Sequence, residues 1–367
     1  MKKLIMHLGF LKTGSTAIQN FLSINRDSLT SDGYLYPKSM IHEQTHNDLW
    51  PFYCKNIGFA NITQKAVCDY YIQLFEKSQQ NTMILSSELL TLASTADAYS
   101  HLTSNFDTKY IIYIRNPIQF AQSLIISNLK AYHVDRSYHG TRLLPTAECT
   151  KHVQYQLNTI KHFFSDKIPF SENIIVRSYD LVCLSKSVVM DFCETIKINY
   201  EDYVDAKKII NPSLSLDCAY FLAHCSLLPI HQKDMSTIIH DLDVISRDRK
   251  GFCRYRIFSK EQIRNIPSET IKEYEEIGRK IGDDNFWDRG LQRYLEMEQC
   301  PWQQLPADLQ NEIFELLSPQ SQDIITSVWP RNHHIHPGLL TNSGFLPDIP
   351  ADEKNACLMR RWIMALK

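Results

Sequence analysis

The stretch KLIMHLGFLKTGST, residues 3–16, consists of an apolar run followed by a loop. The loop has a glycine at each end, and residues with hydroxyl side chains follow it. The run has the composition of a buried strand, and Gly9 and Gly14 bracket a loop that contains Lys12. The backbone N–H groups of such a loop, with the N-terminus of the helix that follows, bind phosphate. We therefore predict a strand, a phosphate-binding loop and a helix over about residues 15–25.

The position of the lysine separates this loop from that of an ATP- or GTP-binding protein. In the nucleoside triphosphate motif, G-x-x-x-x-G-K-[ST], the lysine directly follows the second glycine. Here Lys12 lies inside the loop, and Ser15 occupies the lysine's usual place. The loop is expected to hold a phosphate and to be a poor site for a magnesium-bound triphosphate.

A second predicted strand ends in a cation. Residues 109–114, KYIIYI, are β-branched and aromatic, as buried strands are, and Arg115-Asn116-Pro117 follows them. Proline suits the first position of a helix, so we predict an amphipathic helix from residue 117 that carries Ser123 about two turns on. Because parallel sheets bind ligands at the carboxyl ends of their strands, Arg115 and the glycine loop are expected at one edge of one sheet.

Together the two motifs resemble those of sulfotransferases that use 3′-phosphoadenosine 5′-phosphosulfate (PAPS), in particular bacterial proteins like the carbohydrate sulfotransferases. The form G-x-x-K-T-G-[ST]-T resembles their 5′-phosphosulfate loop. A strand, R-[DN]-P and a serine eight residues after the arginine resemble their 3′-phosphate segment. Downstream, a predicted strand at 173–176 followed by RSYD, and the NPSLS stretch at 211–215, resemble the later course of the family.

The resemblance implies a P-loop-containing three-layer α/β fold, with a central, mainly parallel sheet flanked by helices. The β/α alternation continues to about residue 200, and residues 216–298 are mostly helical in pattern. Beyond residue 300, prolines punctuate one short helix, at about 307–317, and a long irregular stretch. We therefore predict a sulfotransferase-like domain over 1–299 and a helical and irregular C-terminal extension over 300–367.

The resemblance also implies roles for the residues of the two motifs. Lys12 would stabilise the negative charge that grows on the 5′-phosphate oxygen as the S–O bond breaks. Arg115 and Ser123 would bind the 3′-phosphate, and the sequence leaves further ligands of that phosphate open. The 5′-phosphate would be held by the end of the loop and the start of the helix, at Lys12, Thr13, Gly14, Ser15 and Thr16.

An acceptor hydroxyl loses its proton as it attacks, so a general base is expected. Glu88 is the leading candidate, because it follows the predicted strand at 82–85 on the edge from which both motifs emerge. It can instead cap the next helix or pair with a cation of the site. His46 is the alternative base, whereas His7, inside the first strand, is expected in the core.

The acceptor is expected to be a small molecule or saccharide, including glycolipids, that carries a hydroxyl or amine. Stacking and hydrogen-bonding side chains gather between residues 42 and 53, at His46, Asn47, Asp48, Trp50, Phe52 and Tyr53. The sequence does not separate O- from N-transfer. Two other functions stay open: an ATP-dependent P-loop kinase or nucleotidase, and a protein of the same fold that binds nucleotides or partners without catalysis.

The composition limits the classes of partner that this protein is expected to bind. The formal net charge of −2 gives no basic field for nucleic acid. The N-terminus has no signal-peptide pattern and no run reaches the ~18–20 apolar residues of a membrane span, so a cytoplasmic protein is expected. The amphipathic segment 354–367 can dock on the protein body or rest on a membrane surface.

No metal is expected, because the leaving nucleotide of sulfuryl transfer is not a polyphosphate. The histidines at 333, 334 and 336 lack an acidic or cysteine partner at a convincing distance in the sequence and are expected in a solvated loop. PAPS is then the co-substrate, and the oligomeric state is not predicted.

Overall fold

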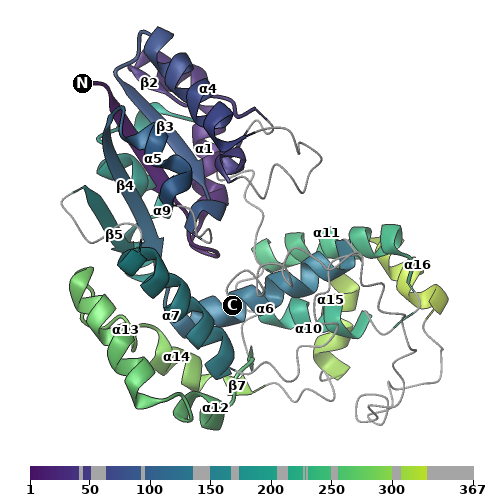
Figure 1. Cartoon of the computed structure of the whole chain (residues 1–367). Helices are drawn as coiled ribbons and strands as arrows, with labels where there is room; N and C mark the ends of the chain where they lie inside the picture. Colours follow the sequence, from purple (N-terminus) through teal and green to yellow (C-terminus); the bar gives the residue numbers. More distant parts are fainter. Residues whose placement is uncertain are drawn as a thin grey trace. The chain divides into compact units, whose positions relative to one another are not determined.

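In the computed structural model the chain forms two compact units (Figure 1). The first unit consists of residues 1–120, 151–211 and 266–289, and the second of residues 121–150, 212–265 and 290–367. The residues that the structure describes are 1–40, 44–50, 63–91, 96–134, 149–166, 173–204, 214–225, 228, 230–248, 255–299 and 307–328.

A five-stranded sheet, parallel at every strand pair, forms the centre of the first unit (Figure 1). Its strands, in the spatial order β2-β3-β1-β4-β5, are β1 (Lys3–Leu8), β2 (Tyr34–Leu35), β3 (Thr82–Ser87), β4 (Asp107–Ile114) and β5 (Ile174–Ser178). The mixed α/β class with a parallel central sheet is therefore confirmed. Because the strands run the same way, the residues that follow β1, β3, β4 and β5 emerge at one edge.

The register brings the loop after β1 beside the residue after β3. Leu8 of β1 is opposite Ser87 of β3, and the backbone N–H of Gly9 donates to the Ser87 carbonyl oxygen at 2.9 Å. Gly9 and Glu88 are thus neighbours across the sheet edge. The loop follows β1, the central strand of the sheet, which has β3 on one side and β4 on the other.

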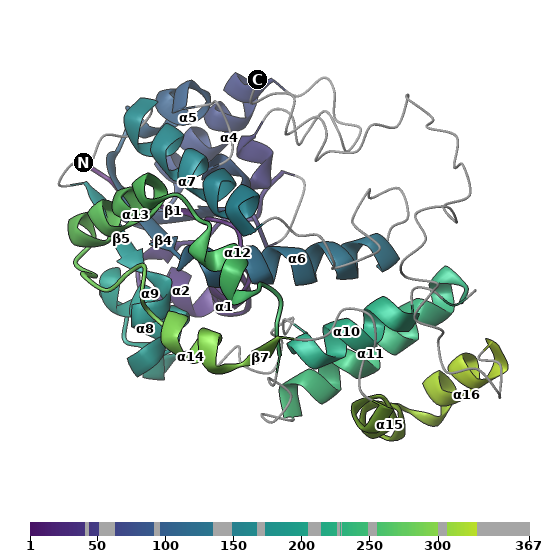
Figure 2. The ribbon, with the colours of Figure 1, turned by 90° about the horizontal axis from the view of Figure 1, so that it is seen from below.

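Helices cover both faces of the sheet, as Figure 2 shows from below. One face carries α1 (Ser15–Ile24), α2 (Arg26–Ser31), α8 (Tyr179–Ser185) and α9 (Val188–Thr195). The other carries α4 (Gln64–Lys77), α5 (Ala96–Thr103) and α7 (Cys149–Asp166). The first unit also contains α13 (Ser268–Lys280) and three short 3₁₀ turns, η1 (Asn47–Leu49), η2 (Leu89–Thr91) and η3 (Tyr200–Asp202).

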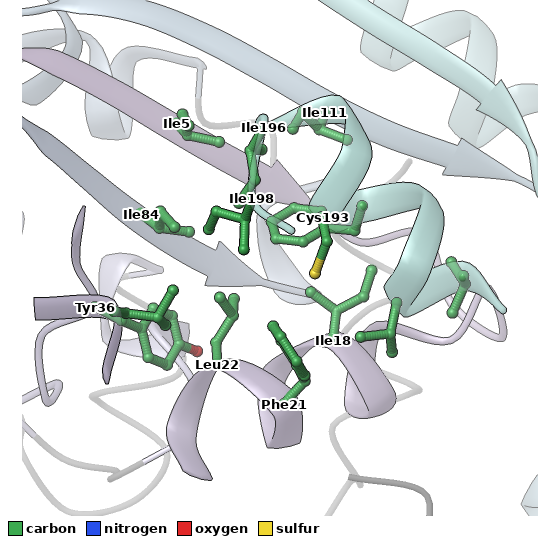
Figure 3. Packing of buried hydrophobic residues seen from close by; sticks show 14 of the residues in the cluster. Ile5, Ile18, Phe21, Leu22, Tyr36, Ile84, Ile111, Cys193, Ile196 and Ile198 are labelled. Carbon is green, nitrogen blue, oxygen red and sulfur yellow. The ribbon is translucent and has the colours of Figure 1, made fainter. Parts of the chain in front are cut away.

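The core beneath α1 explains why this helix stays fixed behind the loop. Ile18, Phe21 and Leu22 point from α1 toward Ile5, Ile84 and Ile111 of three adjacent strands, and Cys193, Ile196 and Ile198 join the same cluster (Figure 3). The opposite side chains of β1, Leu4 and Met6, are also fully buried. Burial on both faces accounts for the nearly continuous apolar run of this strand.

The second unit is mainly helical. Its elements are the greater part of α6 (Pro117–Val134), followed by α10 (Leu216–Cys225), α11 (Gln232–Asp248), α12 (Lys260–Arg264), α14 (Leu291–Glu296), α15 (Ala307–Leu316) and α16 (Pro319–Val328), with a short parallel pair, β6 (Tyr255–Arg256) and β7 (Glu298–Gln299). Lys130 of α6 binds Asp243 of α11 at 2.7 Å. At the start of α12, Ser259 and Gln262 form a capping box.

One prediction for the C-terminal region is wrong. The sequence predicts a long irregular stretch directly after the helix at about 307–317, yet Pro319 begins α16. Proline is well suited to the first helical position, and Ser318 before it donates its backbone N–H and its hydroxyl to Asp241. The division at residue 300 stays a prediction; residues 300–306, the histidines at 333–336 and the segment 354–367 lie outside the described residues.

Within the described ranges, no helix has the length and apolarity needed to cross a bilayer. The same ranges contain no group of three or more His, Cys, Asp or Glu residues arranged to hold a metal ion.

Candidate active site

The loop between β1 and α1 is anchored at its first residue and closed on itself. The Gly9 carbonyl oxygen accepts a hydrogen bond from the Thr91 hydroxyl at 3.0 Å. Within the loop, the buried Thr13 hydroxyl donates to the Phe10 carbonyl oxygen at 2.6 Å. The Thr13 hydroxyl therefore shapes the loop, which leaves its backbone N–H as the group it can offer a ligand.

Two residues of the loop adopt left-handed backbone conformations. Gly14 has φ 80° and Lys12 has φ 63°. Glycine enters this region at no steric cost, whereas a residue with a Cβ is strained there. Gly14 also lacks room for a side chain, because a Cβ would come within 2.8 Å of Val188. Strain at a non-glycine residue is common at functional sites, so Lys12 is a candidate on backbone grounds as well.

The N-terminus of α1 is the phosphate-binding end of the loop. Gly14 precedes it without a side-chain cap, and its first turn contains no acidic residue. The Gly14 carbonyl oxygen accepts from the N–H groups of Ala17 and Ile18 at 2.9 and 3.2 Å. The N–H groups of Ser15 and Thr16 come before the first intrahelical bonds, as in any helix, and are available to an anion that the helix dipole also attracts.

Ser15 adds a buried hydroxyl to this end. Its side chain is 2% exposed, and among the described residues its Oγ atom has no hydrogen-bond partner. An unpaired buried hydroxyl costs free energy, so such a group commonly meets a ligand or a water molecule. Thr16, in the same turn, is exposed.

Glu88 follows β3 directly and interacts with the loop. Its carboxylate accepts a hydrogen bond from the Lys12 backbone N–H and interacts electrostatically with the Lys12 ammonium. Burial raises the pKa of Glu88 above its ordinary value, and both Lys12 interactions oppose that rise. The sheet edge therefore brings together two predicted site residues, Lys12 and Glu88, 76 positions apart in the sequence.

Arg115 follows β4 and also reaches the loop. One guanidinium nitrogen donates to the Lys12 carbonyl oxygen at 3.1 Å, and Nε lies 3.6 Å from Oδ1 of Asp180. The guanidinium carbon lies 5.2 Å from the centre of the Tyr179 ring. Arg115 therefore holds the loop in addition to the 3′-phosphate role predicted for it, and its side chain stays 21% exposed.

Asn116 anchors the turn after Arg115. Its side-chain oxygen accepts from the backbone N–H groups of Ile118 and Gln119, which caps the start of α6. Its side-chain nitrogen donates to the carbonyl oxygens of Phe286 and Trp287 at 3.0 and 2.8 Å. Ser123, farther along α6, is buried and belongs to the second unit, so its contact with a 3′-phosphate stays a prediction.

His46 lies in the core below the sheet edge. It is 1% exposed, its Nε2 lies 3.0 Å from the Pro37 carbonyl oxygen, and its Nδ1 accepts the Ser86 backbone N–H at 3.0 Å. This pattern describes a neutral ring with both nitrogens engaged by backbone, and burial lowers its pKa to about 4. Among the two candidate bases, the geometry favours Glu88.

His7 is completely buried, as predicted. Its Nδ1 lies 2.8 Å from the Ser86 hydroxyl, and burial lowers its pKa to about 3. Two of the residues predicted to contact a saccharide, Asp48 and Trp50, are buried. The Asp48 carboxylate accepts a hydrogen bond from the Tyr71 hydroxyl. Phe52 and Tyr53 lie outside the described residues.

Sequence reasoning did not assign Tyr179 and Asp180 to the site. In the sequence both residues belong to the RSYD stretch that resembles the later course of the family. The available signal was their position, since they follow a strand parallel to β4 and therefore emerge at the edge where Arg115 lies.

The comparisons with known proteins are sparse. The chain matches no protein-family model, and a search of curated proteins finds no significant match. Among solved structures it is similar to a sulfotransferase from Alicyclobacillus acidocaldarius, with a TM-score of 0.36 and 14% sequence identity, covering 60% of this chain and 91% of that chain.

Proposed function

We propose that this protein is a sulfotransferase that moves a sulfuryl group from PAPS to a hydroxyl or amine acceptor. The observation that carries the proposal is the place of Lys12, inside the glycine loop with its charge beside Glu88 and its carbonyl oxygen held by Arg115. A cation, a carboxylate and the N-terminus of α1 thereby converge on one phosphate-binding loop.

The loop suits the 5′-phosphate of the nucleotide. The uncapped start of α1 provides donors where an anion would lie, and so does the Ser15 hydroxyl, which has no hydrogen-bond partner among the described residues. The ammonium of Lys12, inside the loop, would face the oxygen that bridges this phosphate to sulfur. Donors aimed at developing charge typically contribute about 3–4 kcal/mol to transition-state stabilisation.

The chemical step is an in-line displacement at sulfur. The acceptor oxygen or nitrogen forms the new bond to sulfur, the bond from sulfur to the 5′-phosphate oxygen breaks, and the acceptor's proton passes to the Glu88 carboxylate. The products are the sulfated acceptor and adenosine 3′,5′-bisphosphate. As Glu88 becomes neutral, the Lys12 ammonium loses its counter-charge and interacts more strongly with the leaving oxygen, so the two residues act in concert.

Arg115 is proposed to bind the 3′-phosphate, and the contact of Ser123 with that phosphate stays a prediction from the sequence. The guanidinium keeps exposed surface while it holds the Lys12 carbonyl oxygen, and a guanidinium has five donors to share among several acceptors. A saccharide acceptor stays the prediction made from the mixture of aromatic and polar residues between 42 and 53.

A thermal-shift comparison tests the function. Adenosine 3′,5′-bisphosphate should stabilise the protein and Mg-ATP should not, because the displaced lysine disfavours a magnesium-bound triphosphate. A ligand at 100 times its Kd adds about 2.7 kcal/mol to the free energy of unfolding, which is easily measured. Transfer of labelled sulfate from PAPS to sugar, phenol and amine acceptors then identifies the acceptor class. Stabilisation by Mg-ATP alone would favour the kinase alternative and overturn the proposal.

A further inference from the structure

Tyr179 and Asp180, the two residues after β5, contact both phosphate motifs. A Cβ built on Gly14 would come within 3.1 Å of the Tyr179 ring, so the ring lies directly against the phosphate loop. The same ring also contacts the second motif, because its centre lies 5.2 Å from the guanidinium carbon of Arg115. One aromatic ring thus touches the loop after β1 and the arginine after β4.

Asp180 fixes the same arginine by charge. Its Oδ1 lies 3.6 Å from Nε of Arg115, and its Oδ2 accepts the backbone N–H of Asn116. The Asp180 side chain is 8% exposed, so solvent and salt screen this ion pair less than a pair at the surface. Asp283 and Arg289, themselves an ion pair, lie near enough to influence Asp180 electrostatically.

These contacts form a continuous chain from β5 to the loop. Asp180 and Tyr179 orient Arg115, and Arg115 donates to the carbonyl oxygen of Lys12. Lys12 has a left-handed backbone that its own sequence does not favour, so an external contact is needed to hold it. The orientation of Arg115 therefore bears on the loop conformation as well as on any ligand of its own.

We propose that Tyr179 and Asp180 are positioning residues that, through Arg115, hold the Gly9–Gly14 loop in its phosphate-binding conformation. This inference rests on the proposed function and deepens it, because it makes the 5′- and 3′-phosphate sites one coupled unit. Its consequence is specific: loss of Asp180 weakens a ligand that has only a 5′-phosphate, although neither Asp180 nor its partner would touch that ligand's phosphate directly.

The test measures nucleotide affinity of folded variants by calorimetry. Asp180→Asn should weaken both adenosine 5′-phosphate and adenosine 3′,5′-bisphosphate about fivefold or more, the usual lower range of coupling between two sites. Asp180→Glu, which keeps the charge, should recover part of the affinity. A residue that supports only overall stability would lower the melting temperature without changing the affinity of the folded protein.

Asp191→Asn is the matched control. Asp191 is also a buried aspartate, 2% exposed, whose Oδ2 lies 3.4 Å from Nε of an arginine, Arg177, in the same unit. Its variant should lose stability and keep both affinities. If Asp180→Asn does not fold, Tyr179→Leu keeps an apolar contact with Gly14 and removes the ring beside Arg115, and should weaken adenosine 5′-phosphate in the same way.

The outcomes separate the two proposals. If the wild-type protein binds adenosine 3′,5′-bisphosphate and the Asp180 and Tyr179 variants keep wild-type affinity for adenosine 5′-phosphate, the positioning role is overturned and the proposed function stands. If the wild-type protein binds neither nucleotide, the proposed function fails and the positioning role fails with it.

Discussion

The hydroxyl of Ser15 occupies the space beside Gly9: a Cβ built on Gly9 would come within 2.1 Å of the Ser15 Oγ atom. A glycine at one end of the loop is therefore required by a serine at the other end. The conformational freedom of glycine is not the reason, because only Gly14 and Lys12 of this loop have positive φ.

Gly9→Ala should displace Ser15 and lower affinity for adenosine 3′,5′-bisphosphate, with a stability loss of about 1–3 kcal/mol, as overpacking usually costs. Adding Ser15→Gly removes the clashing atoms, so the double variant should regain stability but not affinity. Calorimetry and chemical unfolding measure the two effects. Full recovery of affinity in the double variant would show that the Ser15 hydroxyl does not bind the phosphate.

Lys12 contributes both an ammonium and a strained backbone, and two substitutions separate them. Lys12→Ala and Lys12→Gly should both remove nearly all transfer activity, because neither supplies a cation to the leaving oxygen. Lys12→Gly should be more stable than Lys12→Ala by about 1 kcal/mol, since glycine tolerates the left-handed backbone. A variant that retains more than about a tenth of the wild-type rate would have lost less than ~1.4 kcal/mol and would contradict the leaving-group role.

Glu88→Gln preserves shape and removes basicity, so turnover should fall by ~10²–10⁴ while affinity for adenosine 3′,5′-bisphosphate changes little. Steady-state kinetics and calorimetry measure the two. His46→Gln is the comparison, and it should act through stability because His46 is buried between backbone partners. Loss of turnover in folded His46→Gln with a mild effect in Glu88→Gln would reverse the assignment of the base.

The raised pKa of Glu88 has a second consequence, in stability. A carboxyl whose folded-state pKa lies above its ordinary value of 4.5 binds its proton more tightly when folded, so its contribution to stability declines as pH rises above that value. Glu88→Gln should therefore be more stable than the wild-type protein at pH 7 and should lose that advantage below about pH 4.5. The acid limb of kcat/KM should also lie above that pH, because the carboxylate form of Glu88 is the base.

Acid should destabilise the protein through its two buried histidines. The pKa of His7 is about 3 and that of His46 about 4 in the folded protein, and both rise to about 6.5 on unfolding. The unfolded state then binds more protons below pH 6.5, so stability is complete above that pH and declines below it. Urea unfolding at pH 7.5 and 5.5 should differ by about 1.4 kcal/mol for each histidine.

His7→Gln should remove its share of this acid effect, because it removes one of the two buried imidazoles. Identical pH dependence in wild-type protein and folded His7→Gln would contradict the proposed origin.

Arg115→Ala should weaken both nucleotides, and the bisphosphate more. Binding of adenosine 5′-phosphate should weaken only because Arg115 no longer supports the Lys12 carbonyl oxygen. Binding of adenosine 3′,5′-bisphosphate should also lose a charged hydrogen bond to the 3′-phosphate, worth about 1.5–3 kcal/mol of binding free energy. Calorimetry on both ligands measures the difference. Equal losses would mean that Arg115 acts on the loop alone and that the 3′-phosphate binds elsewhere.

The local sequence already determined most of the elements around the site. The apolar run of residues 3–8, the bracketing glycines and Pro117 predict strands and helices that the structure contains, because strand burial and helix starts depend on a few neighbouring residues. Lys12, Glu88 and Arg115 could be chosen from the sequence because each follows a strand, and parallel strands end at one edge.

Tertiary structure decided which of these residues interact and how. No local pattern states that Arg115 reaches the Lys12 carbonyl oxygen, that Tyr179 lies against Gly14, or that His46 turns both ring nitrogens to backbone groups. These contacts join residues that are distant in the chain, and they depend on strand order and register. A pKa such as that of Glu88 depends on burial and on neighbouring charges, which exist only once the chain has folded.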